Sequence, residues 1–450
     1  MAFVASGKDL MPSSALPLAY YFTAYAAFGG ALLVLIIDPT IPGASFYQPR
    51  VVALVHLLTL GWLTGSILGS LYIVGPLALR VPMRVDKGDW IAFASFVIGA
   101  SGMVSHFWLN SYDGMAWSAV LVIGAVTWVA GGVLGGLRKA TIAWGVRLHI
   151  VLAWLNFLAA AALGMLLGLD HSRGFLSVSP LAAMFAHAHL AAVGWVAMLV
   201  FGLAYRLIPM TLPAAMPAGR SLAISAILLE IGLAALVTTL VLESRLVPLA
   251  AMILVSGVVA FAAQVRGILK GRLPRPAALP RRDWSTWQVH MAMTWALTAV
   301  LIGLTLAFGA GDELRLPLMW AYGVAGLIGF LAQMVIGMQG RLVPLYAWYR
   351  VYAATGTAPS LAANALPSAP WARSIFLCWA VAVPLLAWGL PVANHLLIRT
   401  GAVLLFAGLS LGAGYVTFML RRARFLANPY AGDSGARKIP NVLDRMVPSE

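Results

Sequence analysis

The sequence predicts an all-α, polytopic membrane protein with about twelve transmembrane helices. Of its 450 residues, 62% are hydrophobic and only 10% are charged, and the mean hydropathy is +0.91. A water-soluble domain of this size needs a far more polar surface. Apolar runs long enough to cross the hydrocarbon of a bilayer recur along the whole chain, separated by prolines, glycines and charges.

The predicted spans begin near the amino terminus. The first apolar run, from about Leu16, lacks a small-residue cleavage site and continues as a full span, so no cleavable signal peptide is expected. The single cysteine, Cys378, excludes an intramolecular disulfide. The predicted spans are 17–37, 51–78, 90–110, 115–137, 144–168, 179–209, 220–241, 246–267, 285–308, 316–346, 371–390 and 399–420.

The distribution of charge predicts the orientation of the chain. The net charge is +15, and most of the 29 Lys and Arg residues fall in alternate loops, such as the one with Arg80, Arg84 and Lys87. The opposite loops hold acidic residues such as Asp38 and Asp170. The positive-inside rule then places both termini in the cytoplasm, as expected for a multi-pass protein of a bacterial inner membrane. Anionic lipid accounts for the basic loops, so no nucleic-acid partner is expected.

A motif recurs in the second and sixth predicted spans. It reads H-x4-G-W-x9-Y-x3-P, and it begins at His56 and again at His189. The tenth span keeps the glycine and the proline of this frame, but Val324 stands at the histidine position. Repeats at a fixed spacing usually indicate repeated structure.

The spans that precede these three are also similar to one another. His149 and His290 each lie five residues before a tryptophan, and Tyr20 occupies a similar place in the first span. The chain therefore looks like a single membrane domain over 1–450, with three four-helix repeats that form a pseudo-threefold ring. The second helix of each repeat lines its interior. The repeats are 17–137, 144–267 and 285–420, and a cytoplasmic tail follows at 421–450.

Three histidines are candidate haem ligands. His187 and His189 point to nearly opposite sides of the sixth span, because a helix turns by about 100° per residue, so one side faces the second span and the other the tenth. His56 and His189 have equal predicted depth, near the outer surface. Two imidazoles on neighbouring helices can bind one haem iron from both faces and so form a low-spin electron carrier. The alternative is a set of polar contacts between helices.

Each of the other candidate residues has both a functional and a purely structural interpretation. His187 is expected to hold a second, five-coordinate haem or to donate a hydrogen bond. His106 could bind a metal or a haem propionate, or simply lie at the interface. His149 and His290 could form an inner metal or proton site, or be packing residues related by the repeat. Glu230 lies in the middle of the seventh span, where an ionisable residue is a functional candidate, either as a proton relay or as a neutral hydrogen-bonded group.

The stretch "HAHLAAVGWVAMLVFGLAYRLIP" resembles the tenth helix of the catalytic subunit of haem-copper oxidases, in particular the C-family, cbb-type branch. Twelve spans and threefold pseudosymmetry are also features of that superfamily. The resemblance implies that His187 binds a high-spin haem and that His189 binds a low-spin haem opposite His56. It implies one or two haems, most simply b-type.

The sequence also departs from these oxidases. The motif lies on the sixth span rather than the tenth, and no His-His pair is present to bind copper. The three-His-plus-Glu pattern of nitric oxide reductases is absent as well. NnrS-like proteins, which are haem proteins of the nitric oxide response, are similar in having twelve helices and H-x-H motifs. The chain is interpreted as a divergent relative of these families without the binuclear centre, so copper is not expected.

Three functions remain open at this point. The first is a membrane haem protein that carries electrons from an outer donor, such as cytochrome c or another periplasmic redox protein, to a quinone or a partner subunit in the surrounding lipid. The second is a haem enzyme or sensor that reacts with nitric oxide or oxygen; as an enzyme, the protein would be an oxidoreductase. The third is a transporter with a histidine-lined site.

Overall fold

The predicted all-α membrane fold is confirmed. The computed structural model describes residues 15–43, 46–274, 283–356 and 361–425, and within these ranges it contains twelve helices long and apolar enough to cross a membrane and no β-strand. Each of the twelve predicted spans coincides with one of them, with ends that differ by at most five residues except in the tenth span, which runs to Thr355 rather than to 346. The predicted tail beyond residue 425 lies outside the described residues.

Nine of the spans are single helices. They are α1 (Leu16–Ile37), α4 (Lys87–Trp108), α5 (Met115–Leu137), α6 (Trp144–Arg173), α9 (Leu222–Val241), α10 (Val247–Lys270), α11 (Trp284–Ala307), α14 (Ala369–Gly389) and α15 (His395–Phe425). Local sequence fixes several of their ends. The Asp86 side chain accepts from the backbone N–H groups of Gly88 and Asp89 at the start of α4, and Asp283 caps α11 in the same way.

The second, sixth and tenth spans are longer and are interrupted by π-helix. The second consists of α2 (Pro49–His56), η2 (Leu57–Thr64) and α3 (Gly65–Ala78). The sixth consists of α7 (Pro180–His189), η3 (Leu190–Ala197) and α8 (Met198–Thr211). The tenth consists of α12 (Asp312–Gly323), η4 (Val324–Ala332) and α13 (Gln333–Thr355). Short 3₁₀ turns, Ile41–Gly43 and Ala363–Ala365, lie in the loops.

The three π-helical segments contact one another in the interior of the bundle. The indole Nε1–H of Trp195 in η3 donates to the Thr64 hydroxyl in η2, at 3.2 Å. The indole of Trp62 in η2 donates to the carbonyl oxygen of Ala332 in η4, at 3.4 Å. Both indoles are almost completely buried. The spans that share the sequence motif are therefore joined to one another by the tryptophans of that motif.

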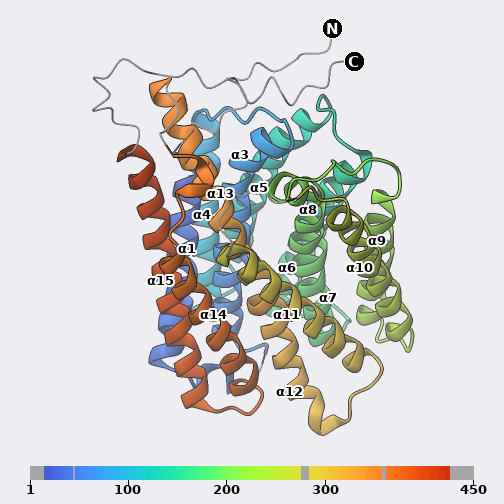
Figure 1. Cartoon of the computed structure of the whole chain (residues 1–450). Helices are drawn as coiled ribbons and strands as arrows, with labels where there is room; N and C mark the ends of the chain where they lie inside the picture. Colours follow the sequence, from blue (N-terminus) through green and yellow to red (C-terminus); the bar gives the residue numbers. More distant parts are fainter. Residues whose placement is uncertain (1–14, 44–45, 275–282, 357–360, 426–450) are drawn as a thin grey trace, which may run out of the picture.

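Each of the remaining helices packs against one of these three spans, and Figure 1 shows all of them in one bundle. The hairpins α4–α5, α9–α10 and α14–α15 are the most extensively paired helices, and α1 packs against α15, so the first and last spans are neighbours. In Figure 1, α15 and α10 lie on opposite sides of the molecule. The threefold repeat and the cytoplasmic side of the termini stay predictions.

Candidate functional site

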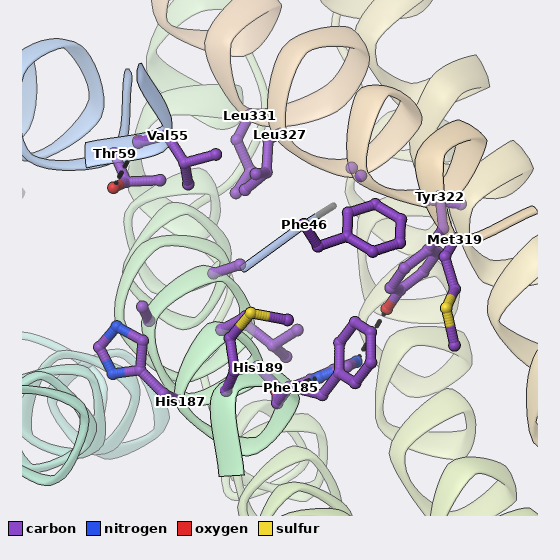
Figure 2. Close-up of a pocket in the computed structure, with 18 of the residues that line it drawn as sticks. Phe46, Val55, Thr59, Phe185, His187, His189, Met319, Tyr322, Leu327 and Leu331 are labelled. Atoms are coloured by element: carbon purple, nitrogen blue, oxygen red, sulfur yellow. Dashed lines mark hydrogen bonds between the residues drawn. The ribbon is translucent and has the colours of Figure 1, made fainter. Parts of the chain in front are cut away.

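One large cavity, of about 1340 Å³, is lined by residues of the second, sixth and tenth spans and of the helices around them. The side chains of His56, His187 and His189 all line it, and most of the remaining lining is apolar. Figure 2 shows His187 and His189 on opposite sides of the helix that carries them, as their spacing predicts. The structure thus brings all three candidate ligands to a single cavity.

His56 lies beside His187. Their ring centroids are 6.2 Å apart and the ring planes differ by 18°. The Nδ1 atom of His56 is 2.8 Å from the carbonyl oxygen of Val52, and that of His187 is 2.9 Å from the carbonyl oxygen of Ala160. Because a carbonyl oxygen can only accept, each Nδ1 carries the proton, and each Nε2 keeps a lone pair available to a ligand.

Two neighbours set the positions of these rings. Phe107 in α4 packs against His56, with ring centroids 4.6 Å apart. Gly164 in α6 leaves room for His187, since a Cβ atom at that position would come within 2.8 Å of the imidazole. The glycine therefore lets the histidine ring lie against the backbone of a neighbouring helix.

His189 faces the tenth span instead. Its Nδ1 donates to the carbonyl oxygen of Phe185 at 2.7 Å, and its Nε2 accepts from the Tyr322 hydroxyl at 3.0 Å (Figure 2). In this structure His187, rather than His189, lies beside His56, and the predicted pairing of His56 with His189 stays a prediction. The rotation of the helix decides which side of an H-x-H meets which neighbour, and sequence spacing does not fix that rotation.

The other predicted residues lie away from the cavity lining. His106 lies in the last turn of α4, and its Nδ1 atom is 2.8 Å from the carbonyl oxygen of Ser111 in the loop that follows. His149 is fully buried, with its Nε2 atom 3.1 Å from the Ser225 hydroxyl. His290 is exposed on α11. Among the described residues, no group of three or more His, Cys, Asp or Glu side chains is arranged to hold a metal ion.

The Glu230 side chain has a hydrogen-bond partner that the sequence did not indicate. The Asn156 amide on α6 donates to the Glu230 carboxyl at 2.7 Å, and Asn156 is buried. Glu230 does not line the cavity that holds the three histidines. Its role as a proton relay stays a prediction, whereas its hydrogen bond to Asn156 is part of the structure.

Replacing Asn156 with alanine is expected to destabilise the protein by about 1 kcal/mol, because the half-buried Glu230 carboxyl then loses its hydrogen-bond donor. Unfolding in SDS, followed by circular dichroism, measures the change. Glu230→Gln is the matched control, because its amide oxygen can still accept from Asn156 and stability should change little. An equal loss of stability in Asn156→Ala and Glu230→Gln would mean that the Glu230 carboxyl is ionised and does more than accept the hydrogen bond from Asn156.

Comparison with known proteins identifies the architecture. Among solved structures, the chain matches a cryo-EM structure of a haem-copper terminal oxidase dimer, with a TM-score of 0.57 and 13% sequence identity over 91% of this chain and 84% of that chain. The chain has the haem-copper terminal oxidase fold. No family model and no curated protein matches the sequence. The kinship with the cbb-type branch or with NnrS-like proteins therefore stays a prediction.

The donor set at His56 and His187 fits the haem that the haem-copper oxidase fold implies. Imidazole nitrogens bind metal ions at about 2 Å, so two imidazoles on opposite sides of one ion have ring centroids roughly 6 Å apart. The observed separation is 6.2 Å, and both Nε2 atoms keep a free lone pair. The cavity around them exceeds the roughly 300 to 1,000 Å³ of most ligand pockets, so it can hold a porphyrin.

Tyr322, Phe107, Gly164 and Asn156 are site residues that sequence reasoning missed. None belongs to the repeated motif, and each lies on a different span from the histidine or glutamate that it contacts. Only the repeat could have indicated one of them. Tyr322 lies two residues before Val324, which stands where the other two spans have the motif histidine.

Proposed function

We propose that this chain is a membrane haem protein that carries electrons, and that His56 and His187 would hold one haem in the outer half of the membrane. The single observation that carries the proposal is the pair of imidazoles 6.2 Å apart, each fixed through Nδ1 by a backbone carbonyl. A bound haem supplies a one-electron redox centre, and two histidine ligands favour the low-spin state suited to electron transfer.

The protein's own residues prepare this site in two ways. The carbonyl oxygens of Val52 and Ala160 hold the imidazoles in the tautomer that leaves Nε2 free, and they make these nitrogens better donors. Phe107 and the apolar cavity wall exclude water from the redox centre, which affects its potential. The Nε2 atom of His189, on the opposite side of α7, already accepts a hydrogen bond from the Tyr322 hydroxyl.

The proposal is tested on the purified protein in detergent. We expect one haem per chain, sharp low-spin bands in the reduced-minus-oxidised spectrum, no response to carbon monoxide and no stoichiometric copper. A colourless protein that takes up no haem would contradict the proposal and favour the transporter. A high-spin fraction that binds carbon monoxide or nitric oxide would instead favour chemistry on a diatomic gas at an open iron position.

A further inference from the structure

A row of aromatic rings leads from the outer surface to His56. The ring of His171, at the end of α6, lies 4.2 Å from the ring of Tyr112, measured between centroids. Tyr112 lies 5.7 Å from Phe107, and Phe107 lies 4.6 Å from His56. Each ring thus contacts the next, and the row ends at the imidazole that we assign to the haem.

The two ends of this row differ in their exposure. His171 is exposed, and Tyr47 packs on it from the loop before α2, with ring centroids 6.0 Å apart. Tyr112 and Phe107 are buried, with 8% and 6% of their surfaces exposed. The row therefore crosses from solvent to the haem site through side chains that exclude water, and it draws on three segments that are distant in the sequence.

The phenols of the row remain neutral under physiological conditions. Burial raises the pKa of Tyr112 to about 12, and burial together with the nearby Asp170 carboxylate raises the pKa of Tyr47. A proton would therefore stay on each phenol at neutral pH. Passage of an electron along the row then requires no gain or loss of protons by these rings.

We propose that His171, Tyr112 and Phe107 form the route by which an electron from a one-electron donor at the outer surface reaches the haem bound by His56 and His187. This inference rests on the proposed function. A reduced donor docked over His171 loses one electron, and the ferric haem iron gains it. No bond forms or breaks in the rings, which serve only as a closely packed medium that shortens the gaps between donor and iron.

Photoinduced electron injection tests the route without a natural donor. In a Cys378→Ser background, Ser172→Cys next to His171 is labelled with a ruthenium bipyridyl complex. A flash then transfers one electron from the excited label to the haem, and a sacrificial amine re-reduces the label. We expect a fast phase of haem reduction, and we expect it to be lost in Tyr112→Leu and in Phe107→Leu but retained in Tyr112→Phe, which keeps the ring.

A second labelling site provides the control. Asn394→Cys lies in another exposed loop, before α15, and injection from a label there should not change with Tyr112→Leu. Haem content and the difference spectrum are measured in every variant before the flash. An unmutated protein that contains no haem would contradict the proposed function itself. Full haem content together with an unchanged fast phase in Tyr112→Leu would contradict only the proposed electron route. Equal slowing from both labels would also overturn it.

Discussion

Replacing His187 with leucine is expected to remove the low-spin haem spectrum. Its imidazole is one of the two rings that lie 6.2 Å apart, so the substitution removes one of the two nitrogen donors of the proposed haem site. Loss of groups that merely support a metal ligand costs roughly 10- to 100-fold in affinity, so loss of the ligand itself should exceed that. His56→Leu should have the same effect. The haem-to-protein ratio and the difference spectrum measure it.

His189→Leu is the matched control for this pair. It removes an imidazole from the same helix and the same cavity, but one whose Nε2 already accepts a hydrogen bond from Tyr322. We expect this variant to keep its haem and its low-spin bands. If His189→Leu were colourless and His187→Leu normal, the assignment of ligands would have to revert to the pair that the oxidase resemblance implies.

Replacing Gly257 with leucine is expected to destabilise the protein by about 3 kcal/mol, the upper end of the usual cost of overpacking. A Cβ atom at Gly257 in α10 would lie 2.7 Å from the backbone nitrogen of Leu229 and 3.0 Å from its Cα atom in α9. The obstacle is backbone, which cannot move aside as a side chain can. The two helices would have to separate. SDS unfolding followed by circular dichroism measures the loss.

Gly267→Leu provides the comparison on the same helix. No atom lies within 4 Å of a Cβ atom built there, and the position is exposed. Because leucine favours helix over glycine by roughly 1 kcal/mol, this variant should be as stable as the unmutated protein or slightly more stable. Equal destabilisation of both variants would show that close approach of α9 and α10 is not what Gly257 provides.

The fold could be predicted to a large extent, because bilayer hydrocarbon imposes a strong constraint on composition and length. All twelve spans follow from apolar runs and charged breaks, and the repeated G-W motif indicates the two helices whose tryptophans hydrogen-bond to neighbouring spans in the interior. That His56 and His189 both line one cavity agrees with their equal positions in that motif.

The partners of these residues could not be predicted in the same way. Which of His187 and His189 meets His56 depends on helix rotation, and the π-helical turns that begin at Leu57 and Leu190 have no evident signature in the sequence. Contacts such as Asn156 with Glu230 or Tyr322 with His189 join residues more than 70 positions apart. Only packing of the whole bundle brings them together.

The π-helical turns make the long spans intolerant of changes in length. If η3 kept its wide turns, losing one residue from it would turn α7 by roughly 80° relative to α8, because a π-helical turn holds about 4.4 residues. His187 would swing away from His56 while the tryptophan contacts stayed in place. Insertions and deletions should therefore accumulate in the loops of this protein and be excluded from these three short segments, even where the residues themselves are freely exchanged.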